Sequence, residues 1–417
     1  MLASQRYYFA VLAVFLVLVS CSFLLFHADE FGRFGKVDEI PHRYDQLLFS
    51  KPTLEETIIS LFGAIKHDPS SPGYIDPSGQ YYKGGDKPTW TRPLGKRVLI
   101  VDIDTRVPTK ENQIFNPGVL DWEHLDMKGG GLVSNAILNH YLYALIHGYD
   151  YMFYQAEHIV DHHDSWIMPH VLRELVPSYQ FVVAMDADVV VPHLEVPLEW
   201  MFNRWGIQSH TSMALPWDTE EFRNNVSIST DSKRLLVLNT GFVVAQNSPL
   251  TQELLEAWRD CTSETRYSDC GQWKHMWSHE QRAFSEYIRY DFNKTPETIV
   301  PIPCNDAVGW PGFKERFEST SPGISDCKGN FIQHHTIRKE YVKEGASNSV
   351  MQVIGQALQQ NLLRQQETLW YKESEHKTVD ETPEVVDLGE NRANAIEASI
   401  SPVVTENLIT DILSKRR

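Results

Sequence analysis

Apolar residues recur along the middle of the chain in short, β-rich runs that alternate with helical stretches. The runs 97–104, 150–154 and 181–185 have the length and composition of strands. Residues 134–147 and 165–176 have helical periodicity, and Gly148 follows the first of these stretches, where a helix commonly ends. This alternation predicts an α/β fold with a mostly parallel sheet that is flanked by helices.

The alternation is weaker in the second half of the chain. There we predict strands at 212–216 and 235–245 and helices at 248–259, 280–289 and 347–366. Residues 67–95 are rich in Pro, Gly, Ser and Tyr, which indicates a linker or an irregular lead-in. From residue 371 onward the chain is acidic, contains Pro and has few aromatic residues, so we expect a largely disordered tail.

The N-terminal segment from Tyr7 to Phe26 is almost uninterruptedly apolar and long enough to span a bilayer, which takes about 20 residues. A cleaved signal peptide is the alternative, but its apolar core is usually shorter and ends at small residues. We therefore predict an uncleaved signal anchor. Arg6 precedes the span and Asp29 and Glu30 follow it, which favours a cytoplasmic N-terminus and a luminal remainder.

These patterns divide the chain into a cytoplasmic tail (1–6), a transmembrane signal anchor (7–26), a stem and linker (27–95), one luminal catalytic domain (96–370) and an acidic tail (371–417). The net charge of −17 argues against a nucleic-acid partner, because nucleic-acid-binding proteins display a basic face. So acidic a chain would also repel an anionic ligand unless a bound cation neutralised the site.

The cysteines agree with a luminal domain. Cys21 lies within the predicted span, and the other four form an even set, as disulfides require. Proximity favours Cys261 with Cys270 and Cys304 with Cys327, although four cysteines allow three connectivities. A zinc site is the poorer alternative, because no pair has the tight spacing of a zinc knuckle. Asn225 and Asn293 begin glycosylation sequons.

The strongest chemical signal is Asp186-Ala-Asp188, which follows the apolar run 181–185 directly. In open α/β sheets, ligands bind at the carboxyl ends of the strands. Paired aspartates are suited to Mg²⁺ or Mn²⁺ that holds a phosphate. We therefore expect a metal site for a diphosphate substrate. A solvated strand end is the alternative, since Asp is also a common turn residue.

Five motifs in order over residues 97–340 resemble the GT-A nucleotide-sugar-dependent glycosyltransferases, and among them the Golgi α-galactosyl and α-mannosyl transferases. The resemblance implies a Rossmann-like GT-A domain. The motifs are Asn139 to Asp150, Ser165-Trp166 with Leu172-Arg173, Asp186-Ala-Asp188, Leu238 to Phe242 with Asn247 and Ala257-Trp258, and His279 to Phe284.

For the metal, the resemblance implies that Asp188 binds the cation that bridges both phosphates. Asp186 then contacts the cation or the nucleotide ribose. It implies a further ligand from His334 or His335, for which a surface histidine pair is the alternative. His162 and His163 are weaker candidates for a ligand or for the rim of the site.

For the donor, the resemblance implies that Glu280 and Gln281 hold the sugar or the charge that develops at its anomeric carbon; a helix cap is the alternative for Glu280. Asn239 is expected to bond sugar hydroxyls. Gly241 is expected to permit close backbone approach, unless it marks a bulge. We also place Asp104, more than Asp102, at the base or ribose.

One departure from the family affects the diphosphate site. Family members usually carry a Lys after the Trp of the second helix, whereas Trp166 is followed here by Ile167-Met168-Pro169. Arg338 or Lys339, after the histidine pair, is expected to supply that positive charge.

The resulting expectation is a single-pass type II enzyme of the Golgi or ER membrane. It would use Mn²⁺ or Mg²⁺ to transfer a hexose, first of all galactose or mannose, from UDP-hexose or GDP-hexose to a glycan on protein or lipid. The resemblance alone implies that the transfer retains the anomeric configuration. A complex with other glycosyltransferases is an additional expected partnership. The alternatives are a luminal metal-dependent hydrolase of nucleotide sugars or phosphoesters, and a degenerate member that serves as a scaffold.

Overall fold

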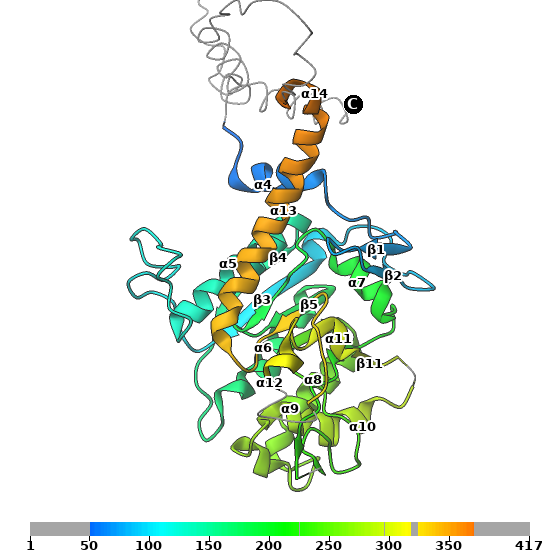
Figure 1. The fold of residues 1–417 in the computed structure, drawn as a ribbon. Helices are drawn as coiled ribbons and strands as arrows, with labels where there is room; N and C mark the ends of the chain where they lie inside the picture. Colours follow the sequence, from blue (N-terminus) through cyan, green and yellow to red (C-terminus); the bar gives the residue numbers. More distant parts are fainter. Residues whose placement is uncertain (1–50, 225, 296, 318–323, 371–417) are drawn as a thin grey trace, which may run out of the picture. The chain divides into compact units, whose positions relative to one another are not determined.

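The structure is a computed structural model, and it describes residues 51–224, 226–295, 297–317 and 324–370 (Figure 1). The predicted span 7–26, Asn225 and the predicted tail from 371 lie outside the described residues. No helix in the described ranges is long and apolar enough to cross a membrane. The described residues from Glu55 onward belong to one compact unit.

A six-stranded sheet forms the centre of this unit, with the strand order β11-β7-β10-β5-β3-β4. β10 pairs antiparallel with both of its neighbours, β5 and β7, and every other pairing in the sheet is parallel. The sheet is therefore mostly parallel, as the sequence predicts. Its strands are β3 (Val98–Asp104), β4 (Asp150–Gln155), β5 (Phe181–Met185), β7 (Met213–Pro216), β10 (Phe242–Gln246) and β11 (Ile299–Ile302).

Side chains alternate between two hydrophobic clusters, one on each face of the sheet. In β3, Val98 and Ile100 belong to one cluster, whereas Leu99 and Val101 belong to the other. All seven residues of β3 are buried, which explains why its sequence is apolar without alternation. Full burial of each large aliphatic or aromatic side chain contributes about 1.5–3 kcal/mol.

Helices cover both faces. On one side, α5 (Gly130–His147) and α7 (Leu198–Trp205) contribute Tyr143 and Trp200 to the core. On the other side, α6 (Ile167–Leu175) and α8 (Pro249–Arg259) contribute Leu172 and Trp258. A further helix comprises α9 (His279–Ala283), a π-helical turn (Phe284–Ile288) and α10 (Arg289–Phe292). Such π turns frequently accompany functional sites.

The long helix α13 (Val342–Arg364) packs against α5 (Figure 1). Asn139 of α5 joins them, since its Nδ2 donates to Ser349 Oγ at 3.2 Å and to Val191 O at 3.3 Å. The other helices and strands are α4 (Leu54–Gly63), β1 (Gly73–Ile75), β2 (Tyr81–Lys83), β6 (Val189–Val190), β8 (Phe222–Arg223), β9 (Val226–Ser227), α11 (Cys304–Ala307), α12 (Phe313–Phe317), β12 (Gln333–His334) and α14 (Gln366–Leu369).

The lead-in to the sheet packs into the core in its described part. Phe62, Ile65, Tyr74, Trp90 and Leu94 are all buried members of the cluster that contains Val98. The Pro- and Gly-rich composition of residues 67–95 therefore corresponds to an irregular lead-in, one of the two alternatives that the sequence left open, and the bounds of the stem and linker stay a prediction. A fragment that begins at residue 67 would remove two of these core side chains.

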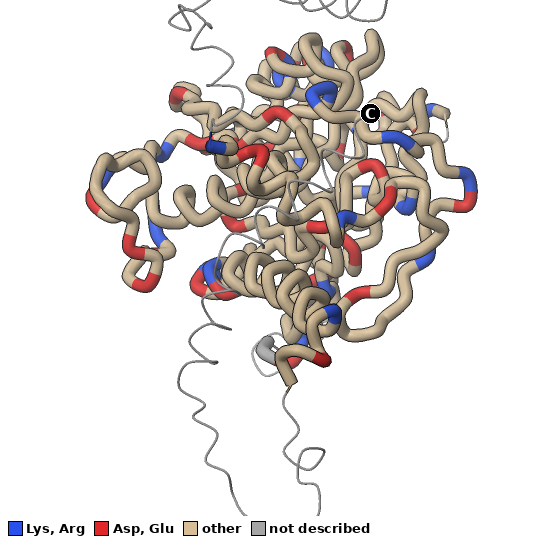
Figure 2. The backbone as a smooth tube through the Cα atoms, turned by 90° about the horizontal axis from the view of Figure 1, so that it is seen from above, with Lys and Arg blue, Asp and Glu red and all other residues tan. Residues whose placement is uncertain are grey.

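Both disulfides form as proximity favoured, Cys261 with Cys270 and Cys304 with Cys327. Charged positions of both signs are interspersed along the described chain in the view of Figure 2. Cations close to the site therefore matter more for an anionic substrate than the net charge of −17 does.

Candidate active site

Two short strands bring distant parts of the sequence together at the end of β5. β6 follows the Asp186-Ala-Asp188 turn and pairs antiparallel with β12, so that His334 lies opposite Val189. The backbone of His335 also donates to Asp188 O at 2.9 Å. This pairing fixes His334 beside the two aspartates.

The side chains of Asp186, Asp188 and His334 form a cluster whose potential ligand atoms all lie within 4.8 Å of one another. His334 Nε2 is 3.4 Å from Asp188 Oδ1 and 3.9 Å from Asp186 Oδ2. Asp188 and His334 are buried, whereas 45% of the Asp186 side chain is exposed, which leaves the cluster open to a ligand on that side. Two carboxylates and one imidazole fit Mn²⁺ well. Among the described residues, no other group of three His, Cys, Asp or Glu is placed to hold a metal.

His334 is oriented for metal binding by Asn239 and Gly241. His334 Nδ1 lies 3.0 Å from Asn239 Oδ1, and because a carbonyl oxygen only accepts, Nδ1 carries the hydrogen. Nε2 is the nitrogen that faces the carboxylates. A hydrogen bond of this kind to a ligand's other ring nitrogen fixes the orientation of the ring and its tautomer. The ring also lies so close to Gly241 that a Cβ at that position would be 2.1 Å from His334 Cε1.

The charges in the cluster lie close enough to shift one another's pKa values. Burial raises the pKa of Asp188, but His334 and Lys339 outweigh it and hold that pKa well below its usual range. Burial and the neighbouring Asp188 charge raise the pKa of Asp186 to about 6. Burial lowers the pKa of His334, but the charges of Asp188 and Asp186 outweigh it and raise that pKa.

His335 lies outside the cluster, although the sequence left the choice between the two histidines open. His335 directly follows β12, which ends at His334. The His335 ring stacks on Trp310 at a centroid distance of 5.5 Å. It is buried, its ring nitrogens form no hydrogen bond with described residues, and burial lowers its pKa to about 4.

His162 and His163 also lie outside the cluster. His162 Nε2 is 2.8 Å from Thr262 Oγ1. The His163 ring stacks on that of His279, 3.7 Å away, immediately before Glu280. The structure therefore places His163 at the rim of the Glu280 helix.

Glu280 is a buried carboxylate at the start of α9. Its Oε1 accepts from Thr240 Oγ1 at 2.9 Å, whereas the buried Oε2 forms no hydrogen bond of good geometry with described residues. Burial raises the pKa of Glu280 to about 7, although Ser165 and Thr240 lower it, and the charge of Asp186 raises it further. Trp258 Nε1 donates to Glu280 O at 3.0 Å and fixes the backbone.

Asp218, which the sequence analysis did not single out, connects Gln281 to Asn239. Its Oδ2 accepts from Gln281 Nε2 at 2.9 Å, and its Oδ1 accepts from Asn239 Nδ2 at 3.0 Å. Gln281 Oε1 in turn accepts from Thr240 N at 3.0 Å. Asn239 and Gln281 are thus engaged within the protein and hold His334 and the Glu280 turn. The sugar contacts expected of Asn239 and the close donor approach expected at Gly241 stay predictions.

The cation beside the aspartates is Lys339, not Arg338. Lys339 Nζ lies 3.0 Å from Asp188 Oδ2. Arg338 is exposed and pairs with Glu340 at 3.3 Å, so its expected contact with the diphosphate stays a prediction.

Arg106 is a second cation that the sequence analysis missed. It binds Asp104 through its Nε at 2.8 Å and its Nη2 at 2.5 Å. This hydrogen bond raises the pKa of Arg106 against the effect of burial, and the charges of Asp188 and Asp186 add to it. Asp104, which we expected at the base or ribose, therefore anchors a partly exposed guanidinium near the metal cluster.

Asp102 has an internal role. Its Oδ1 lies 2.6 Å from His140 Nδ1, and its Oδ2 accepts from the Tyr151 hydroxyl. His140 Nε2 lies 3.1 Å from Val189 O, so this buried pair supports the strand that follows Asp188.

No protein-family model matches the sequence, and no curated protein matches it. Solved structures that are similar include a glycosyltransferase involved in the glycosylation of the major capsid of PBCV-1, with 14% identity, a TM-score of 0.38, and coverage of 60% of this chain and 98% of that one. Mouse xyloside xylosyltransferase 1 has 10% identity and a TM-score of 0.32, with coverage of 58% and 98%. The glycosyltransferase GlyE of Streptococcus pneumoniae TIGR4 has 11% identity and a TM-score of 0.32, with 64% of each chain covered.

Proposed function

We propose that the chain is a metal-dependent glycosyltransferase of the GT-A type, which transfers a hexose from UDP-hexose or GDP-hexose to a glycan acceptor with retention. The observation that carries this proposal is the cluster of Asp186, Asp188 and His334 at the carboxyl end of β5. Ligands of open α/β sheets bind at that edge. The buried Glu280 beside it supplies a carboxylate for the donor sugar.

Asp186, Asp188 and His334 would hold Mn²⁺ or Mg²⁺, with the imidazole favouring Mn²⁺. When bound, the divalent cation supplies Lewis-acid stabilisation of the leaving diphosphate. Lys339 and Arg106 add positive charge at the same edge, which offsets the acidic character of the chain. The diphosphate is thereby oriented toward the sheet edge.

Glu280 faces the site with a carboxylate whose pKa of about 7 allows both protonation states near neutrality. As a carboxylate it stabilises positive charge that develops at the anomeric carbon, and as an acid it donates to a sugar hydroxyl. Gln281, Asp218 and Asn239 fix the backbone and the imidazole around it. The chain's contribution is therefore positioning and electrostatic stabilisation.

We further propose a type II topology in the Golgi or ER membrane, anchored by residues 7–26, with the acceptor on protein or lipid. The two disulfides support an oxidising compartment.

Transfer is tested with the full-length chain, labelled UDP- and GDP-hexoses, and Mn²⁺. Each donor is incubated with a pool of glycoprotein oligosaccharides and, separately, with water alone. The proposal predicts a labelled glycan from one donor, lost in Asp188→Asn and retained in Asp326→Asn, which removes an exposed carboxylate in the same way. Equal donor breakdown without acceptor would favour a hydrolase, and no turnover at all would favour the scaffold.

A further inference from the structure

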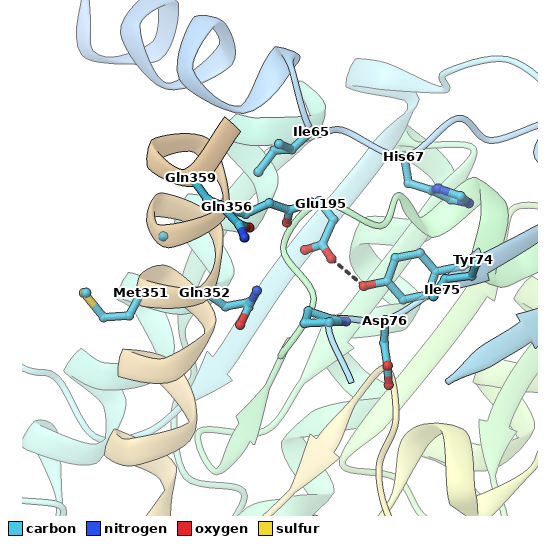
Figure 3. Close-up of a pocket in the computed structure, with 12 residues that line it drawn as sticks. Ile65, His67, Tyr74, Ile75, Asp76, Glu195, Met351, Gln352, Gln356 and Gln359 are labelled. Atoms are coloured by element: carbon cyan, nitrogen blue, oxygen red, sulfur yellow. Dashed lines mark hydrogen bonds between the residues drawn. The ribbon is translucent and has the colours of Figure 1, made fainter. Parts of the chain in front are cut away.

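A second cavity lies apart from the metal cluster, between α13, β1 and Glu195 (Figure 3). Its volume is about 550 Å³, within the range of small-molecule sites. None of Asp186, Asp188 and His334 lines it.

Glu195 supplies the buried polar group of this cavity. Only 4% of the residue is exposed, and its Oε1 accepts from the Tyr74 hydroxyl at 2.5 Å. Its Oε2 is buried and has no hydrogen-bond partner among the described residues. In Figure 3 the carboxylate lies between the Tyr74 ring and the glutamines of α13. A buried carboxylate oxygen requires a donor, so this atom indicates a ligand with hydrogen-bond donors.

The opposite wall presents three amides. Gln352, Gln356 and Gln359 are spaced by four and three residues, which places them on one face of α13. None of their side chains forms a hydrogen bond with another described residue. Each amide both donates and accepts, as is needed to bind hydroxyl groups.

The charge of the lining excludes anionic ligands. Asp76 and Glu195 are acidic, and no Lys or Arg lines the cavity. Asp186, Asp188 and His334 form the one group among the described residues that is placed to hold a metal. The acids of this cavity and His67 therefore do not form a metal site. Ile65, Ile75 and Met351 add apolar surface. The lining thus fits a neutral ligand that is rich in hydroxyls and has apolar faces.

We propose that this cavity is a carbohydrate-binding site, separate from the transfer site, in which Glu195 accepts hydrogen bonds from sugar hydroxyls and the three glutamines bind the opposite side. α13 runs from the segment that follows the metal cluster to the cavity, because Gly345 lies near His335 while Met351, Gln352 and Gln359 line the cavity. At 1.5 Å per residue, the cavity begins about 9 Å along the helix from Gly345. Binding here requires neither metal nor donor, so the proposal goes beyond the proposed transfer activity.

The test measures sugar binding by the full-length chain in a zwitterionic, sugar-free detergent with EDTA. The probes are α-mannobiose, lactose and maltotriose, with spermidine and inorganic phosphate as charged comparators, each titrated into the millimolar range. Saturation-transfer NMR detects contact, and calorimetry gives the dissociation constant.

We expect at least one neutral sugar to saturate the site. Glu195→Gln keeps an acceptor for Tyr74 but loses the charged acceptor, and it should weaken binding about tenfold. Gln356→Ala should weaken binding several-fold, whereas Gln360→Ala, on the same helix but outside the lining, should leave it unchanged. Asp188→Asn should also bind the sugar as the parent does.

Several results would overturn the proposal. These are no binding by any neutral sugar, binding of spermidine or phosphate alone, and binding that survives both Glu195→Gln and Gln356→Ala. Loss in Asp188→Asn would place the sugar at the metal cluster instead. If sugar binding persists while no donor is ever turned over, the transfer proposal fails and this one stands.

Discussion

Replacing Gly241 with Ala tests whether His334 is held in place for metal binding. The new Cβ would lie 2.1 Å from His334 Cε1, where an ordinary contact begins at 3.4 Å. The ring would therefore retreat by about 1.3 Å, although metal–ligand distances tolerate only about 0.2 Å. Its retreat is also constrained by Asn239, 3.0 Å from Nδ1.

The expected cost has two parts. Misplacing one ligand should weaken Mn²⁺ binding about 10–100-fold, or about 1.4–2.8 kcal/mol. Overpacking against a buried ring should lower the free energy of unfolding by about 1–3 kcal/mol.

Calorimetric titration with Mn²⁺ and thermal denaturation of the full-length variant measure both quantities. Gly63→Ala is the matched control, because nothing lies within 4 Å of the Cβ that it adds. Parent-like Mn²⁺ affinity and melting temperature in Gly241→Ala would refute the close approach of His334 and its role as a ligand.

Three further predictions concern the surroundings of the site. Because the pKa of Glu280 is raised from 4.5 to about 7, the parent loses stability as the pH rises between these values. Relative to the parent, Glu280→Gln in EDTA should therefore gain up to about 3 kcal/mol more free energy of unfolding at pH 8 than below pH 4.5. An equal stability difference between variant and parent at both pH values would contradict the burial argument. Replacing Cys304 and Cys327 with Ala opens a loop with a sequence separation of 23 and should cost about 3 kcal/mol in a urea titration, whereas no loss would show that this bridge does not stabilise the folded state. His140→Phe removes the imidazole that contacts Asp102 Oδ1 and Val189 O. The free energy of unfolding should fall by about 1–3 kcal/mol for each acceptor left without a partner, and Mn²⁺ binding should weaken. Parent-like Mn²⁺ binding would show that the His140–Asp102 pair does not support the metal site.

Much of the fold follows from local sequence. The strand predicted at 181–185 has the same bounds as β5, because an apolar run that ends on two aspartates leaves little choice of boundary. α5 begins at Gly130, four residues before the predicted start, because glycines carry no helical signal. The predicted strand 235–245 was wrong in its first half, where the apolar residues Leu236 and Leu238 form only isolated bridges and the strand begins at Phe242.

The site was only partly predictable, because its decisive contacts join distant segments. The aspartates follow from the end of one strand, but the choice of His334 over His335 depends on the register between β6 and β12. Asp218 follows the end of β7 and Arg106 follows the end of β3, so the rule that ligands bind at strand ends could have found both. The internal role of Asn239 depends on hydrogen bonds that no periodicity encodes.

The most direct test of the central claim is donor binding by the full-length chain with and without Mn²⁺. Calorimetry is run against UDP- and GDP-hexoses for the parent, Asp188→Asn and Asp326→Asn. If Asp186, Asp188 and His334 hold the metal, one donor should bind in the presence of Mn²⁺ and not in its absence. Asp188→Asn should abolish this binding, whereas Asp326→Asn should retain it. Donor binding that is indifferent to Mn²⁺ and to Asp188→Asn would contradict the account.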